Sequence, residues 1–172
     1  MCTATPRGWA SSIFNRSHYE DVLVVRVHDL VPKKLWKARY DHIADFEALL
    51  AEHGTIVLKY FLHITKREQK ERLLEREKDP ANAWKLNPND WKERDCWDEY
   101  TEAYEDAISK TAAKHAPWTL VPANAKWYRN LVVAESIVEA LRAHRKDWRK
   151  KLEQVAAEAK AALAAYRRQR KK

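Results

Sequence analysis

The sequence predicts an α/β fold in which a small parallel sheet is flanked by helices. Residues 33–53 carry apolar residues at helical spacing, residues 55–62 form a nearly continuous apolar run, and residues 118–122 form a further short β-prone run. With a first strand at 9–14, the strand, helix, strand order implies a right-handed crossover and parallel strands. The continuous run at 55–62 indicates a strand covered on both faces.

The chain opens with a turn at Pro6 and Gly8, after which residues 9–14 are expected to form a short buried strand. Ser17 is followed three residues later by Glu20, and this capping box predicts that a helix begins there. The β-branched run at 22–27 favours a strand by propensity. We favour the helix, partly on this cap and partly on the resemblance described below.

The helix predicted at 33–53 is amphipathic, follows Pro32 and ends at Gly54. After the second strand, Thr65 and Glu68 form another capping box and begin a basic helix. Arg72 and Arg76 of that helix are four residues apart, so they share a face and their like charges repel. That face is either an anion-binding site or an ordinary solvated face neutralised by neighbouring glutamates.

Asp79 precedes Pro80, and the residue before a proline disfavours the helical conformation, so the basic helix is expected to end there. A loop containing Trp84 and Lys85 follows. Asn87 is then an N-cap with Pro88 at the first helical position, which restarts a helix. A basic helix joined to a loop with a further lysine suits a lid that closes over phosphates.

The rest of the chain is predicted to form a helix at 95–114, the third strand at 118–122 and a helix at 123–141. Residues 142–172 are rich in Ala, Lys, Arg and Glu and predict one long helix. This tail contains twelve Lys and Arg against three acidic residues. The tail therefore has a net charge of +9. Because the whole chain has a formal charge of +8, residues 1–141 have a net charge of −1, and the basic excess lies in the tail.

Composition narrows the class of protein further. A chain of 172 residues with 45 % hydrophobic residues and eight Trp can bury the core of one domain. No run approaches the roughly 20 apolar residues of a membrane helix, and the first residues lack a signal-peptide pattern, so a cytoplasmic protein without membrane association is expected. Cys2 and Cys96 are far apart and indicate neither a disulfide framework nor a zinc site.

Three segments occur in an order that resembles the polyphosphate kinase 2 family. They are FNRSHYEDVLVVRVH, LLEREKDPANAWKLNPNDWKERDCWDEYTEAYEDAI and HAPWTLVPANAKWYRNL, and the resemblance covers residues from about Pro6 to Leu141. It implies an α/β, P-loop-kinase-like parallel sheet flanked by helices, with a helical lid at about 65–95. Residues 1–141 would then be a partial polyphosphate kinase 2-like domain, and residues 142–172 a basic helical tail.

The resemblance also implies roles for particular residues. FNRSHYED matches the Walker B-like region, where Asn15 stands at a position that is Asp in many members. Arg72, Arg76 and Lys85 of the lid would stabilise the negative charge of the phosphoryl group during its transfer, and Asp79 would fix the hinge of the lid. From the residues alone, Arg16 could equally cap a neighbouring helix and Glu20 could serve only its capping box. The implied catalytic residues are Arg16, Arg72, Arg76, Asp79 and Lys85, and the implied substrate-binding residues are Asn15, Glu20, Asp21, Lys126 and Arg129.

The activity that the resemblance implies is phosphoryl transfer from inorganic polyphosphate to AMP or ADP, with Mg²⁺ as cofactor and ATP as one product. Homo-oligomers are common in the family. The sequence contains only Gly8 and Gly54 and no G-x-x-x-x-G-K-[ST] loop. We therefore expect an N-terminally truncated catalytic domain, whose activity alone is left open. The alternative is a non-catalytic module that binds a polyanion, either polyphosphate or nucleic acid.

Overall fold

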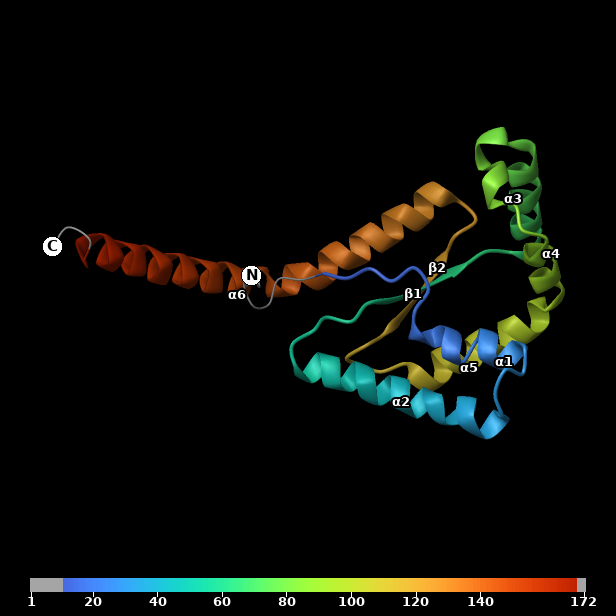
Figure 1. Ribbon diagram of the computed structural model, residues 1–172, viewed down its shortest axis with the longest axis horizontal. Coiled ribbons are helices and arrows are strands. Elements are labelled where there is room, and N and C mark those ends of the chain that lie inside the picture. The colour runs from blue at the N-terminus through green and yellow to red at the C-terminus, as the bar shows by residue number, and fades with distance from the viewer. Residues whose placement is uncertain (1–10, 170–172) are drawn as a thin grey trace. The chain divides into compact units, whose positions relative to one another are not determined.

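The computed structural model describes residues 11–169 and confirms a mostly helical α/β protein with a small parallel sheet (Figure 1). Its described residues form two compact units. The first unit contains residues 11–59 and 66–118, and the second contains residues 60–65 and 119–169.

The N-terminal part of the first unit is helical at residues 24–27, within the run at 22–27 where the sequence was compatible with either a helix or a strand. Ser17 caps a 3-10 helix, η1 (His18–Asp21), with its hydroxyl oxygen 3.3 Å from the Tyr19 backbone nitrogen, and helix α1 (Val24–Val27) follows. The helix is thus confirmed over the competing strand. The strand predicted at 9–14 is wrong for residues 11–14, which pair with no strand in the described chain, and residues 9 and 10 lie outside it.

The core of the first unit lies between helices α2 (Lys33–Glu52) and α5 (Trp97–Thr111), which run side by side in Figure 1. The helix predicted at 33–53 is confirmed. The helix predicted at 95–114 is observed over a shorter range, Trp97–Thr111, and its buried residues are Ala103, Ala107 and Thr111. The buried cluster comprises Tyr19, Val22, Leu23, Trp36, Tyr40, Ile43, Ala103 and Ala107.

Between these helices in the sequence lies the basic segment, residues 66–95. It consists of α3 (Lys66–Lys78), the 3-10 helix η2 (Pro80–Lys85) and α4 (Pro88–Asp95). Asn87 caps α4, because its side-chain oxygen accepts a hydrogen bond of 3.0 Å from the Asn89 backbone nitrogen. The two proline-marked boundaries are therefore confirmed.

The second unit contains most of the parallel pair β1 (Lys59–His63) and β2 (Trp118–Pro122), together with helix α6 (Lys126–Gln169). Strand β1 starts at Lys59, later than predicted, because residues 55–58 form neither strand nor helix after the turn that ends α2. Gly54 has a φ of 81°, and the Thr55 backbone nitrogen donates to the Leu50 carbonyl at 3.0 Å, as in a glycine-capped helix terminus. The expected burial on both faces is also wrong, since Leu62 is 47 % exposed.

Helix α6 joins residues 126–141 of the predicted helix and residues 142–169 of the predicted tail in one uninterrupted element of 44 residues, and residues 170–172 of the tail lie outside the described residues. None of its residues is buried. Near its start, the Tyr60 hydroxyl donates to Ser136 Oγ at 3.2 Å, and the Ala123 backbone nitrogen donates to the His63 carbonyl at 2.7 Å. None of the helices within residues 11–169 combines the length and the apolar character that crossing a bilayer requires.

Candidate functional site

Arg16 lies in an unusual backbone conformation directly before η1. Its φ is 71°, in the left-handed region that costs a non-glycine residue about 1–2 kcal/mol. The side chain is exposed, and it forms no ion pair with any residue from 11 to 169. The turn therefore presents an unpaired guanidinium to solvent at a conformational cost, a combination that occurs often at ligand sites.

A buried polar network holds the other end of this turn. Tyr19 is 5 % exposed, and its hydroxyl lies 2.9 Å from Glu47 Oε1 and 2.9 Å from Thr111 Oγ1. Lys59 Nζ donates to Glu47 Oε2 at 2.6 Å, to the Tyr19 hydroxyl at 3.0 Å and to the Thr111 carbonyl at 2.9 Å. Tyr19 is thus fixed by α2, β1 and α5, and it fixes the turn that carries Arg16.

Burial sets the charge states in this network. Burial raises the pKa of the Tyr19 hydroxyl well above its usual range, so the hydroxyl stays protonated at neutral pH. Burial also lowers the pKa of the Lys59 ammonium, while hydrogen bonding to the Glu47 carboxylate opposes that change. We take Lys59 to be charged, because a carboxylate lies 2.6 Å away. The network is therefore a buried ion pair with a tyrosine bound to it.

Glu47 and Lys59 were not among the residues predicted from the sequence. Each has a weak signal, since Lys59 interrupts the apolar run at 55–62 and Glu47 follows Phe46 in the amphipathic helix. Neither signal shows that the two side chains meet. Thr111 lies 92 residues from Tyr19 in the sequence, so only the fold reveals that contact.

A second set of ionisable residues lies within electrostatic reach of Arg16. The Tyr100 hydroxyl donates to Glu93 Oε2 at 2.8 Å, and His28 Nε2 is 3.0 Å from the same oxygen. These hydrogen bonds lower the pKa of the Glu93 carboxyl, and the positive charge of Arg16 contributes to the same shift. Burial and the hydrogen bond to Glu93 raise the pKa of the Tyr100 hydroxyl, and the negative charge of Glu20 adds to this shift. Arg16 and Glu20 therefore share one charged environment with α4 and α5.

The two predicted arginines of α3 are each paired with a carboxylate. Arg72 Nε donates to Glu68 Oε1 at 2.7 Å within the helix, and Arg76 Nη1 donates to Asp90 Oδ2 at 2.9 Å on α4. The ion pair between Arg72 and Glu68 agrees with the second of the two alternatives, a solvated face neutralised by neighbouring glutamates. Arg76 is still 34 % exposed, so its guanidinium remains accessible to an incoming anion.

Asp79 and Lys85 lie at the two ends of η2. Asp79 Oδ1 accepts a hydrogen bond of 3.0 Å from the Ala81 backbone nitrogen, and its other oxygen accepts one from the Asn82 side chain. Lys85 Nζ donates to Asn82 Oδ1 at 2.9 Å and lies 5.0 Å from the centre of the Trp84 ring. Asp79 thus organises the turn, while Lys85 and Trp84 are exposed on it.

Asp79→Ala is expected to destabilise the basic segment by about 1 kcal/mol, the usual effect of removing an N-cap side chain. The loss follows because the Ala81 backbone nitrogen and the Asn82 amide both lose their acceptor. Urea unfolding followed by circular dichroism measures the change. Asp79→Asn keeps one acceptor oxygen and should recover most of the loss; an equal loss in both variants would contradict a capping role.

The remaining predicted residues are distributed over both units. Asn15, which directly precedes Arg16, and Asp21, at the end of η1, are exposed, and Asp21 Oδ1 is 3.6 Å from Arg39 Nη1. Lys126 and Arg129 belong to the second unit, in the first turn of α6. The Arg129 guanidinium contacts Asn130 Oδ1 at 2.8 and 3.1 Å. Of the ten predicted residues, eight are therefore in the first unit and two in the second.

The fold and this arrangement of charges identify the general class: a mostly helical α/β protein whose ionisable residues gather around the turn at Arg16. Comparison with protein families then gives the family. The model of the polyphosphate kinase 2 (PPK2) family matches residues 1–149, which is most of the chain. The chain therefore belongs to the polyphosphate kinase 2 family.

Two curated relatives and one solved structure show the extent of the similarity. The chain is 54 % identical over 136 residues to the AMP/ADP-polyphosphate phosphotransferase of Meiothermus ruber, covering 79 % of this chain and 51 % of that protein. It is 40 % identical over 141 residues to the ADP-polyphosphate phosphotransferase of Rhodopseudomonas palustris, covering 75 % and 49 %. The crystal structure of polyphosphate kinase 2 from Arthrobacter aurescens TC1 matches with a TM-score of 0.74 and 45 % identity over 76 % of this chain and 46 % of that one. The chain thus spans about half the length of these relatives.

Proposed function

We propose that this chain serves phosphoryl transfer from inorganic polyphosphate to AMP or ADP, in the role of a polyphosphate-dependent nucleotide phosphotransferase. The observation that carries the proposal is Arg16, an exposed cation without an ion-pair partner in residues 11–169, held in a costly left-handed conformation. Support comes from relatives named as AMP/ADP- and ADP-polyphosphate phosphotransferases.

Phosphoryl transfer depends mainly on positioning the reactants and on neutralising the charge that develops on the phosphate oxygens. A planar guanidinium suits this task because it can donate two parallel hydrogen bonds to a phosphate. In this proposal Arg16 binds phosphate from the η1 side. Tyr19 and the Lys59 and Glu47 pair are positioning residues that keep Arg16 in place.

The basic segment acts in this proposal as a lid that supplies the remaining positive charge. Arg72 and Arg76 exchange their carboxylate partners for phosphate oxygens when polyphosphate binds, and Lys85 contributes a further ammonium. The exchange is feasible because both arginine pairs are partly exposed, and exposed ion pairs are weak. Asp79 keeps its capping role and fixes the turn between α3 and Lys85.

Mg²⁺ is the cofactor that the family resemblance implies, and the carboxylates of this chain set a limit on how it could be held. Among the described residues, no group of three or more His, Cys, Asp or Glu could hold a metal ion. Mg²⁺ commonly binds through one or two carboxylates, with waters and substrate phosphates completing its shell. Glu20 and Asp21 fit that smaller role. When bound, the ion would neutralise phosphate charge.

The purified full chain is expected to form ATP from ADP, and ADP from AMP, when polyphosphate and Mg²⁺ are supplied. Arg76→Ala should lower the rate at least about tenfold, a smaller loss than that of an unpaired cation, because Asp90 already offsets part of its charge. Arg67→Ala is the matched control on the same helix, since Arg67 is 86 % exposed and forms an ion pair only with Glu71 among the described residues. No turnover by the wild type would overturn the proposal, and equal rates in the two variants would overturn the role of Arg76.

A further inference from the structure

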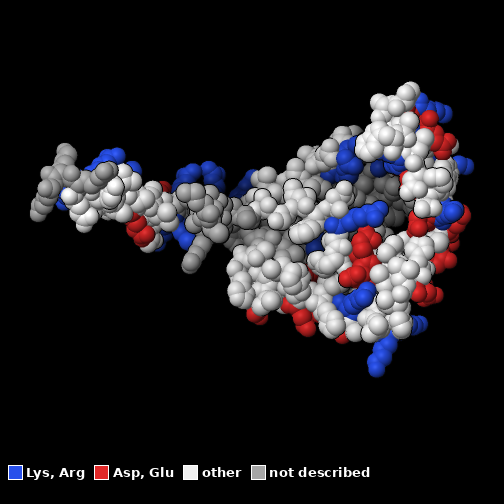
Figure 2. All heavy atoms as spheres, in the orientation of Figure 1, with Lys and Arg blue, Asp and Glu red and all other residues white. Residues whose placement is uncertain are grey.

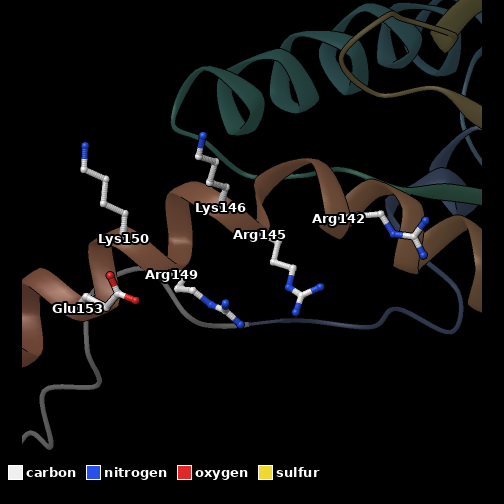
Figure 3. Close-up of a pocket in the computed structure, with 6 residues that line it drawn as sticks. All are labelled: Arg142, Arg145, Lys146, Arg149, Lys150 and Glu153. Carbon is white, nitrogen blue, oxygen red and sulfur yellow. The ribbon is translucent and has the colours of Figure 1, made fainter.

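Helix α6 carries a row of basic residues that the site described above does not use. Five cations lie at spacings of three and four residues, so they project from one face of the helix over about two turns. Figure 3 shows two of these side chains on one edge of this face and two on the other, with a single glutamate at its end. We call this set the α6 ladder; it comprises Arg142, Arg145, Lys146, Arg149 and Lys150.

The ladder is uncompensated, in contrast to the basic residues of α3. On α3, Arg67 and Arg72 each form an ion pair with a glutamate four residues away. On α6, no ladder residue forms an ion pair with another residue in the range 11–169, and Glu153 in the same hollow pairs with none of them. Like charges four residues apart destabilise a helix, so this row costs stability when the protein is alone.

The charge pattern in Figure 2 agrees with this difference. Lys and Arg side chains mix with Asp and Glu over the region of α3 to α5, whereas residues 142–169 of α6 contain nine basic and three acidic residues. Such a surface attracts an extended polyanion, whose binding releases the counterions that both partners hold. A compact monovalent anion would meet only one or two of the five cations.

The ladder provides positive charge but lacks the aromatic side chains that stack on nucleic-acid bases. Single-stranded nucleic acids are bound by aromatic rings interleaved with cations, because the bases stack on the rings. No aromatic side chain belongs to the ladder face. The neighbouring Trp148 is stacked on His144, with ring centres 5.4 Å apart and an interplanar angle of 21°. A polymer of phosphates with no bases matches this surface best.

We infer that the α6 ladder is a docking site for inorganic polyphosphate, separate from the residues around Arg16. The identity of the polymer rests on the proposed function, which makes polyphosphate the donor substrate. The ladder binds one part of a long donor chain, while another part of the same chain is consumed. Tethering of this kind raises the effective concentration of the donor, so it favours long polymers over short ones.

The test compares two variants of the full chain with equal loss of charge from the same helix. The ladder variant replaces four cations by glutamine: Arg145, Lys146, Arg149 and Lys150. The control variant replaces four cations outside the ladder by glutamine: Lys151, Lys160, Arg167 and Arg168. Glutamine is a good helix former, and equal circular dichroism at 222 nm establishes that both variants keep the helix.

Binding of fluorescently labelled long-chain polyphosphate is measured without nucleotide or Mg²⁺ over a series of salt concentrations. The ladder variant should bind at least about tenfold more weakly at low salt, and its slope of log K against log salt should fall by about 3. The control variant should lose much less affinity. In turnover assays, the ladder variant should raise the KM for long-chain polyphosphate and leave the KM for tripolyphosphate unchanged.

Each outcome decides between the hypotheses. Equal losses in the two variants would overturn the ladder as a defined site, because net charge alone would explain binding. Single-stranded RNA that competes at the same phosphate concentration would overturn the assignment to polyphosphate. If binding depends on the ladder but the wild type transfers no phosphate, the proposed function fails and the docking site stands.

Discussion

Arg16→Ala is expected to lower phosphotransfer from polyphosphate to ADP by about 10²- to 10³-fold, with little change in folding stability. The size of the loss follows from removing one cation that donates to a developing phosphate charge. The guanidinium has no ion-pair partner within residues 11–169, so no ion pair has to break before it binds a ligand. Initial rates measured over a range of polyphosphate and ADP concentrations give kcat and KM separately.

Arg16→Gly distinguishes a functional arginine from a structural one. Glycine adopts a φ of 71° without steric cost, which recovers about 1–2 kcal/mol, although its freedom in the unfolded chain costs about 0.5–1 kcal/mol. We therefore expect this variant to be as stable as the wild type or more stable by up to about 1.5 kcal/mol, and to be as inactive as Arg16→Ala. Higher stability with lost activity would identify strain that is retained for function.

Asp29→Gly is the matched control, because Asp29 is the other described non-glycine residue with a positive φ, at 48°. It lies between α1 and α2 and is exposed, outside the proposed site. This variant should also be stabilised, but it should keep full activity. If Arg16→Gly retained wild-type turnover, Arg16 would have only a structural role and the proposed function would lose its main support.

The residues that begin and end the helices could be predicted from the sequence, because they act locally. Ser17, Gly54 and Asn87 each form the predicted cap, and the two proline-marked boundaries of the basic segment are where they were expected. The strands were harder, because a strand needs a partner elsewhere in the chain. Residues 11–14 have the composition of a strand but no pairing within the described chain.

The candidate site could be predicted only in part, for a related reason. The family resemblance supplied Arg16 and the arginines of α3, but it could not show which of them would be free. The structure shows Arg76 paired with Asp90 across two helices, and Arg16 unpaired among the described residues. The pairing of Lys59 with Glu47 depends on how a strand packs against a helix, so residue type and spacing did not indicate it.

Lys59→Met is expected to cost about 3–5 kcal/mol of folding stability, the largest effect on stability that we predict. Removing the ammonium leaves the Glu47 carboxylate, which is 2 % exposed, with the His18 ring at 3.5 Å as its one remaining ion-pair partner among residues 11–169. Glu47→Leu should cost a similar amount, because it leaves the Lys59 ammonium buried and unpaired. Urea unfolding monitored by Trp fluorescence and by circular dichroism gives the two free energies.

The double variant Lys59→Met/Glu47→Leu separates the cost of an unpaired charge from the value of the pair. Two apolar side chains of similar volume leave no buried charge, so the double variant should be more stable than either single variant. Arg67→Met and Glu71→Leu on α3 are the control pair, because those side chains are 86 % and 55 % exposed and should each change stability by less than about 1 kcal/mol. Additive losses at Lys59 and Glu47 would contradict the ion pair.

Activity of the double variant then tests whether this network positions Arg16. The Tyr19 hydroxyl loses two of its partners, the Lys59 ammonium and the Glu47 carboxylate, and keeps Thr111 Oγ1 at 2.9 Å. If the network fixes the turn, a folded double variant should have a lower kcat with little change in the KM for ADP, because the arginine is present but poorly oriented. Unchanged kcat in a folded double variant would show that the pair serves stability alone.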